Sequence, residues 1–166
     1  MYHTPHFTDI PDGKDSLKNE VALVKISDEK DLPPWAHRET LISFLHETMK
    51  PYEDSPGDIN RGLDYVFSKE PGKGGFLVLA GYQDQLVGVL VMLDTGMEGY
   101  IPKNLLLFVS VTPELRGHGL GRRIIELATA DLDGQVKLHV EYDNPAKRLY
   151  ERIGFESKYA EMRLSR

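Results

Sequence analysis

A basic, glycine-rich segment at residues 116–121 is the strongest candidate for chemistry in this sequence. It reads Arg116-Gly117-His118-Gly119-Leu120-Gly121 and is followed by Arg122 and Arg123. Glycines let the backbone approach a ligand closely, and the free N–H groups at the start of a helix attract anions. This glycine turn (residues 116–121) therefore predicts a site for a phosphate or diphosphate. A tight turn without any ligand explains the glycines about equally well.

The spacing of the glycines excludes two common nucleotide motifs. A dinucleotide fingerprint needs a third glycine where this chain has Arg122. A Walker loop ends in Gly-Lys-Ser/Thr, which is absent both from the glycine turn and from the glycine-containing residues 71–75. ATP and GTP are therefore poor candidates for the anion.

Composition limits the classes of protein and partner. The chain has 166 residues, 40% hydrophobic and 28% charged, which fits one folded domain. We expect an N-terminal arm over residues 1–20 and a single domain over residues 21–166. The net charge of −6 argues against nucleic acid as a partner.

Several kinds of site and location are also excluded by composition. The chain has no cysteine, so disulfides and thiol nucleophiles are ruled out. The six histidines show no metal-ligand spacing, so we expect no metal. No apolar run approaches the roughly 20 residues of a membrane helix, and the first residues do not resemble a signal peptide. We expect a cytoplasmic protein with no membrane partner.

The glycine turn joins two strongly apolar elements. Residues 105–111 are nearly all apolar, which is typical of the middle strand of a helix-covered sheet. Residues 119–132 show helical spacing of apolar positions, and residues 136–140 predict a second strand. This strand–helix–strand unit places the two strands parallel.

The remaining elements follow from periodicity and from turn residues. Strands are expected over residues 21–26, 76–82, 86–93, 155–159 and 162–164, and the second and third form a hairpin. One helix is expected within residues 35–49, and Asp58 is expected to cap the next. A last helix begins at Pro145, capped by Asn144 or Asp143, and ends at Gly154.

Two segments together resemble the signatures of one enzyme superfamily. Residues 109–121 look like the acetyl-CoA signature of the GNAT N-acetyltransferases, Arg/Gln-x-x-Gly-x-Gly/Ala, with Arg116, Gly119 and Gly121 in its fixed places. Residues 143–155 are similar to a second hallmark, Asn-x-x-Ala-x-x-Leu-Tyr-x-x-x-Gly-Phe. In one departure, the position of the family asparagine is occupied by Asp143, and Asn144 comes one place later.

The resemblance implies an α/β (α+β) fold and a CoA site. The fold has a mixed, mostly antiparallel central sheet with a parallel, splayed strand pair, flanked by helices. The pantetheine arm would lie between the parallel strands, near the backbone of Val109 and Val111, with Asn144 as a further contact. The amides of the glycine turn would hold the diphosphate, namely those of Arg116, Gly117, His118, Gly119, Leu120 and Gly121. The implied reaction is direct transfer of an acetyl group from acetyl-CoA to an amine.

Acid and base roles are less sharply indicated. The resemblance places Tyr150 at the thioester sulfur, although its helical stripe also suits core packing. An amine with a reference pKa of about 10.4 must lose a proton before it attacks. Glu141 is our preferred base, and the alternatives are His139 and the loop carboxylates Glu53 and Glu98. Each of these is also an ordinary surface or strand residue. Trp35 and Tyr52 are candidates for the edge of the acceptor pocket.

The acceptor is defined only by class. The acidic balance favours a cationic acceptor, which would be a small-molecule amine or a peptide amine. The missing obvious base keeps an alternative open, a noncatalytic acyl-CoA-binding sensor or regulatory module. Many proteins that carry these signatures are dimers, so a homodimer is also open, although nothing in the sequence identifies a self-complementary face.

Overall fold

The computed structural model describes residues 4–8, 10 and 16–166, which form an α/β fold around one five-stranded sheet. The strands, in spatial order, are β1 (Ala22–Ile26), β2 (Gly75–Tyr82), β3 (Gln85–Asp94), β4 (Asn104–Val111) and β5 (Val136–Leu138). Neighbouring strands from β1 to β4 are antiparallel, and β4 and β5 are parallel. This confirms the predicted mixed, mostly antiparallel sheet.

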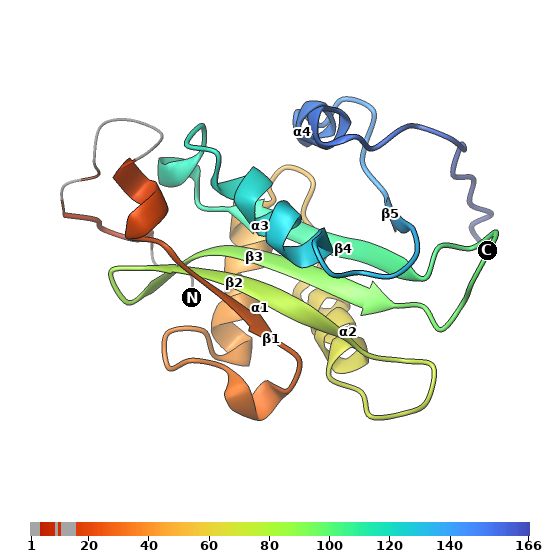
Figure 1. Ribbon diagram of the computed structural model, residues 1–166, viewed down its shortest axis with the longest axis horizontal. Helices are drawn as coiled ribbons and strands as arrows, with labels where there is room; N and C mark the ends of the chain where they lie inside the picture. Colours follow the sequence, from red (N-terminus) through yellow and green to blue (C-terminus); the bar gives the residue numbers. More distant parts are fainter. Residues whose placement is uncertain (1–3, 9, 11–15) are drawn as a thin grey trace.

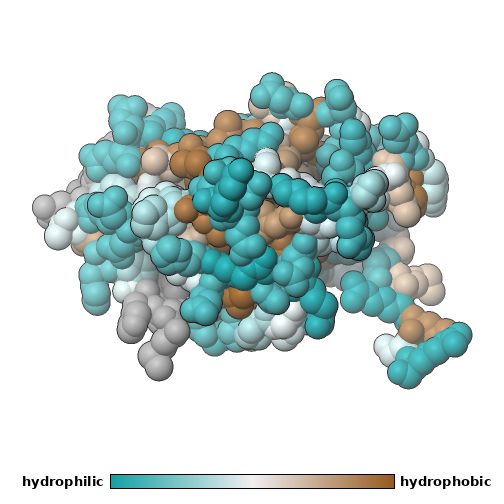
Figure 2. All heavy atoms as spheres, turned by 90° about the horizontal axis from the view of Figure 1, so that it is seen from below, coloured by the Kyte–Doolittle hydropathy of each residue, from teal (hydrophilic) through white to brown (hydrophobic). Residues whose placement is uncertain are grey.

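Helices cover both faces of the sheet (Figure 1). Helices α1 (Arg38–Thr48) and α2 (Pro56–Val66) lie on one face, and α3 (Leu120–Thr129) and α4 (Ala146–Ile153) lie on the other. Three short 3-10 helices, η1 (Ser16–Asn19), η2 (Glu29–Asp31) and η3 (Pro113–Leu115), complete the regular structure. Seen from the side of α1 and α2, the surface is mostly hydrophilic with small apolar patches (Figure 2).

The two-sided burial explains why the inner strands are continuously apolar. Along β2, Val78 packs in the cluster that contains α3, while Leu77 and Leu79 pack in the cluster that contains α1 and α2. Side chains of a strand alternate between faces, so a sheet covered on both sides needs apolar residues at every position. The middle strand is β3, buried from Leu86 to Leu93, and not β4 as its apolar sequence suggested.

Local signals placed most turns correctly. The predicted β2–β3 hairpin is present, with Gln83 and Asp84 at φ 50° and 55°, as a two-residue primed turn requires. Helix α2 begins earlier than expected, because Ser55 rather than Asp58 caps it. The Ser55 hydroxyl accepts the N–H of Asp58 at 3.1 Å, and Pro56 occupies the first helical position.

The end of the chain departs most from the predictions. Strand β5 stops at Leu138, two residues before the expected end at Val140. The strands expected over residues 155–159 and 162–164 are wrong, because these residues form no regular structure and are mostly exposed. A strand exists by pairing, and the three-residue edge strand β5 offers little backbone to pair with.

Part of the expected N-terminal arm packs onto the sheet. Leu17 of η1 is buried in the core cluster that contains α3, and the ring of Phe7 lies 5.4 Å from that of Tyr82. The rest of the arm, residues 1–3, 9 and 11–15, lies outside the described residues. No helix of the described chain has the length and apolarity needed to cross a membrane.

Candidate functional site

The glycine turn has a backbone that only glycine adopts easily. After η3, Gly117 and Gly119 have φ values of 80° and 79°, and α3 begins at Leu120. These angles lie in the left-handed region, which costs other residues free energy. A Cβ built on either glycine meets no atom within 4 Å. The turn therefore needs its glycines for conformation and leaves open space beside them.

The start of α3 offers main-chain donors to that space. The N–H of Arg123 donates to the carbonyl of Gly119, which closes the first turn of the helix. The N–H groups of residues 120–122 precede that bond and have no carbonyl of their own helix to reach. Together with the helix dipole, such groups form a site for an anion. The local backbone therefore supports the diphosphate site expected from the sequence.

Strand β4 presents an open edge next to this turn. Its parallel pairing with β5 covers only residues 104–106, opposite residues 136–138. Further along, the N–H of Thr112 donates to Val87 of β3, while the carbonyl of Val111 accepts from a side chain instead. Because main-chain groups alternate in direction along an antiparallel strand, those of Val109 and Val111 face away from β3. They face the gap that β5 leaves, where the sequence placed a pantetheine arm.

The side chains of Arg116 and His118 in the glycine turn both contact carbonyl groups. The Nε of Arg116 donates to the carbonyl of Val111 at 3.0 Å, and its Nη2 donates to the carbonyl of Thr48 at 2.6 Å. The Nδ1 of His118 lies 3.1 Å from the carbonyl of Arg116, so that nitrogen carries the proton in this contact. These two side chains are therefore engaged with carbonyl groups, and the donors left free at the start of α3 are main-chain N–H groups.

Tyr150 lies on α4, close to the start of α3. A Cβ on Gly121 would lie 3.3 Å from the Cδ2 of Leu149, the residue before Tyr150, so the two helices approach closely here. Tyr150 is only 8% exposed and its ring makes an edge contact with Phe155. Burial, and then the negative charge of Glu141, raise the pKa of Tyr150 to about 12. Its hydroxyl is therefore a proton donor at neutral pH.

Glu141 lies in the loop between β5 and α4, held by Asn144. The Nδ2 of Asn144 donates to Oε2 of Glu141 at 2.9 Å, and its Oδ1 accepts the N–H of Ala146 at 3.0 Å. Helix α4 begins at Ala146 with Pro145 at its N-cap and no side-chain cap there, so the expected cap by Asn144 or Asp143 is wrong. Asn144, the residue before the N-cap, instead accepts the first N–H of the helix. The Asn144 side chain has both of its polar ends engaged within this loop, so its observed role is to orient the loop and Glu141.

The α1–α2 loop (residues 49–55) contacts the loop between β5 and α4 that carries Glu141. The hydroxyl of Tyr52 donates to the carbonyl of Asp143 at 3.2 Å, which joins this loop to the β5–α4 loop. The loop rises past the sheet towards α3 and α4 (Figure 1). The pKa of Tyr52 is raised, first by burial and then by the charges of Asp143 and Glu141. Tyr52 therefore lies at the edge of the site, as the sequence suggested, and half-buried Glu53 follows it.

Three other candidates lie apart from this group of residues or on its margin. Trp35 packs over Gly81 in the cluster of α1 and α2, where a Cβ on that glycine would lie 2.8 Å from the ring. Glu98 is exposed in the β3–β4 connection, at the end of β4 opposite the glycine turn. His139 is exposed and follows the end of β5. Trp35 and Glu98 are thus separated from Tyr150 by the sheet or by the length of β4.

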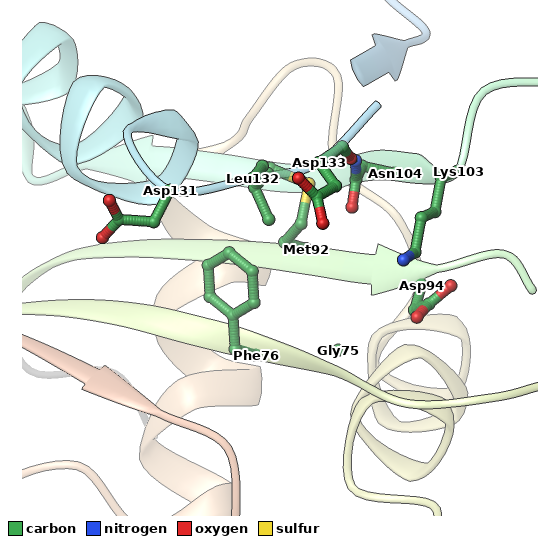
Figure 3. A pocket seen from close by; sticks show the side chains of 9 residues that line it. All are labelled: Gly75, Phe76, Met92, Asp94, Lys103, Asn104, Asp131, Leu132 and Asp133. Atoms are coloured by element: carbon green, nitrogen blue, oxygen red, sulfur yellow. The ribbon is translucent and has the colours of Figure 1, made fainter. Parts of the chain in front are cut away.

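A hollow between β2, β3 and the segment after α3 is a different feature. Phe76 and Met92 form its floor, and Asp94, Lys103 and Asp133 point into it (Figure 3). It lies by Asn104, at the beginning of β4, whereas the glycine turn follows the end of that strand. Among the described residues, no group of three or more acidic or histidine side chains is arranged to hold a metal ion.

The sequence patterns did not predict the contacts that join the region around the α1–α2 loop to the β5–α4 loop and to the glycine turn. Tyr52 and Asp143 are 91 positions apart, and Arg116 and Thr48 are 68 apart. No local pattern reports such contacts. Residues 50–57 contain two prolines, two carboxylates and a tyrosine, which is typical of an exposed loop, but this composition does not identify the segment that the loop contacts.

A comparison with protein-family models gives one match. Residues 73–157 match the family model described as an acetyltransferase (GNAT) domain. The segment includes β2 to β5, the glycine turn and α4. A search of curated protein sequences gave no significant match.

Solved structures share the fold at low sequence identity. A putative GNAT-family acetyltransferase from Desulfovibrio desulfuricans has 20% identity and a TM-score of 0.62, over 84% of this chain and 87% of its own. A GNAT-family protein from Streptococcus pneumoniae has 14% identity and a TM-score of 0.61, over 88% and 98%. An aminoglycoside acetyltransferase from an uncultured soil metagenomic sample, solved with sisomicin, has 13% identity and a TM-score of 0.59, over 90% and 98%.

Proposed function

Because the chain belongs to the GNAT acetyltransferase family, we propose that it transfers the acetyl group of acetyl-CoA directly to an amine of a small molecule or peptide. The observation that carries the proposal is the juxtaposition of two backbone features. The main-chain groups of Val109 and the N–H of Val111 face the gap that β5 leaves beside β4, whereas the carbonyl of Val111 is bound by Arg116. The free N–H groups of α3 begin at Leu120. An extended, amide-containing arm fits the first feature and a diphosphate fits the second.

Tyr150 suits the leaving side of the reaction. A thiol has a reference pKa of about 8.5, so complete proton transfer from a tyrosine with a pKa of about 12 costs about 5 kcal/mol. A hydrogen bond from the hydroxyl to the developing thiolate avoids that cost. We therefore assign Tyr150 to hydrogen-bond stabilisation of the thiolate as the C–S bond breaks.

The acceptor amine needs a base to take its proton, and nearby negative charge would favour a cationic acceptor. Glu141 is the carboxylate whose charge acts on Tyr150, and we assign it to accept the amine proton, directly or through water. Burial, and then the charges of Asp58 and Glu141, raise the pKa of Asp54 in the α1–α2 loop. These carboxylates repel one another, and a cationic acceptor would relieve that repulsion. The complex of the soil acetyltransferase with sisomicin adds support for an amine acceptor.

Direct transfer is what the family membership implies, and the absence of cysteine is consistent with it. The chain has no cysteine to form a thioester with the enzyme. In the proposed step, the neutral amine nitrogen attacks the acetyl carbonyl, the C–S bond breaks, and the sulfur leaves as a thiolate. The amide product retains the acetyl group, and the amine proton passes to Glu141.

The proposal is tested by measuring binding and turnover together. Isothermal titration with acetyl-CoA measures affinity, and a thiol reagent measures CoA release with a panel of polyamine, aminoglycoside, amino acid and peptide amines. Because the protein has no cysteine, the reagent detects only the released CoA. Amine-dependent release supports the transferase. Tight binding without release from any amine favours the sensor, and no binding of acetyl-CoA overturns both.

A further inference from the structure

We propose that Arg116 is a positioning residue whose guanidinium group couples the glycine turn to the α1–α2 loop. This inference rests on the proposed function and deepens it, because it assigns to Arg116 control of the acceptor side. The family resemblance instead led us to expect that the main-chain amide of Arg116 binds the diphosphate, but that amide donates to the carbonyl of Pro113.

The contacts of Arg116 leave its side chain little freedom. Its Nε donates to the carbonyl of Val111 at the end of β4, and its Nη2 donates to the carbonyl of Thr48 at the end of α1. Helix α1 lies on the face of the sheet opposite α3, so the side chain joins the two layers around the end of the sheet. The main-chain N–H of Arg116 is also engaged, with the carbonyl of Pro113.

The contact with Thr48 is favourable and specific to arginine. Thr48 is 5% exposed and is the last residue of α1, where the helix dipole places partial negative charge on the carbonyl groups. A guanidinium donates in fixed, divergent directions and so spans two carbonyls at once. A lysine ammonium keeps the charge but is a single point donor, so it does not reproduce the bridge.

The α1–α2 loop, which begins directly after Thr48, contains Tyr52 and Asp54, which we place near the acceptor amine. Five residues lie between Thr48 and Asp54, and one of them, Tyr52, donates its hydroxyl to the carbonyl of Asp143. The Nδ1 of His46 on α1 also lies 2.9 Å from the carbonyl of Asp54. Arg116 thus fixes one end of a loop whose middle contacts the segment that holds Glu141. Loss of the bridge would displace the loop relative to Tyr150 while leaving the N–H groups of α3 in place.

The test compares Arg116→Lys and Arg116→Met with Arg122→Met. Arg122 is a matched control, because it lies in the same region but pairs with Glu126 on the surface. We expect both Arg116 variants to raise the KM for the amine about tenfold, while the Kd for acetyl-CoA changes no more than in Arg122→Met. Amide hydrogen exchange of residues 49–55, measured without ligand, should become at least several-fold faster in both Arg116 variants and remain unchanged in the control.

Two results would overturn the inference. One is an Arg116→Lys variant with the wild-type KM for the amine and wild-type protection of the loop amides, because a positive charge without the two-carbonyl bridge would then be enough to hold the loop. The other is a large loss of acetyl-CoA affinity in both Arg116 variants with an unchanged amine KM. The exchange measurement needs no substrate, so it decides whether Arg116 holds the loop even if no amine is acetylated. A failed amine panel with an intact loop response would reject the proposed function and not the bridge.

Discussion

Tyr150 and Glu141 lie within electrostatic reach of each other, and burial followed by the charge of Glu141 raises the pKa of the tyrosine to about 12. The tyrosine comes from α4 and the carboxylate from the loop that precedes it. Their pairing combines a group that keeps its proton with a group that can accept one. The proposed transfer of an acetyl group to an amine would use these two groups as proton donor and proton acceptor.

Replacing the hydroxyl of Tyr150 should slow turnover. In Tyr150→Phe the ring still packs against Phe155, but the donor to the thiolate is lost. We expect kcat to fall by about a hundredfold or more, with little change in the Kd for acetyl-CoA. Steady-state kinetics and isothermal titration check the two parts. An unchanged kcat would show that the tyrosine serves only packing.

Removing the charge of Glu141 should impair the attacking side. Glu141→Gln keeps an oxygen that can accept from Asn144, so the loop should remain ordered. We expect a fall in kcat of about tenfold or more that becomes smaller as pH rises, because a larger fraction of the amine is then already neutral. The pH–rate profile measures this. Glu98→Gln, at the far end of β4, is the matched control and should behave like the wild-type protein.

A negative charge at the glycine turn should oppose acetyl-CoA binding. Gly119→Glu and Gly119→Gln impose the same backbone strain at φ 79°, and their side chains are nearly equal in size. We expect the glutamate variant to bind acetyl-CoA at least about tenfold more weakly than the glutamine variant. Isothermal titration on folded variants gives the ratio. Equal affinities would place the diphosphate away from this turn.

Alkaline pH should destabilise the fold through Tyr150. An unfolded tyrosine has a pKa of about 10, so between that pH and about 12 the unfolded chain loses this proton while the folded chain keeps it. The free energy of unfolding therefore falls as pH rises through this range. At about pH 11, the contribution of Tyr150 to this fall is about 1 kcal/mol. Urea unfolding at about pH 9 and about pH 11 should show a smaller loss in Tyr150→Phe. An equal loss in both proteins would contradict the shift.

The sequence predicted the parts of the site that depend on neighbouring residues. The glycine turn, the β2–β3 hairpin and the parallel strand pair follow local patterns, and the structure confirms the strands and the turns. The end of the chain was mispredicted because alternation of apolar residues does not ensure a pairing partner. The contacts of Arg116 with Thr48 and of Tyr52 with Asp143 were beyond local patterns, since they depend on how distant segments fold together.

The early parting of β4 from β5 has a consequence for how the protein responds to its substrate. A bound pantetheine chain would lie in the gap between β4 and β5 and pair with the main-chain groups of β4 that β5 does not reach. At a ligand concentration 100 times the Kd, such occupancy adds about 2.7 kcal/mol to the free energy of unfolding. Under the proposed function, the melting temperature of the protein should therefore rise with the concentration of acetyl-CoA, because the contacts that bind the coenzyme also stabilise the fold.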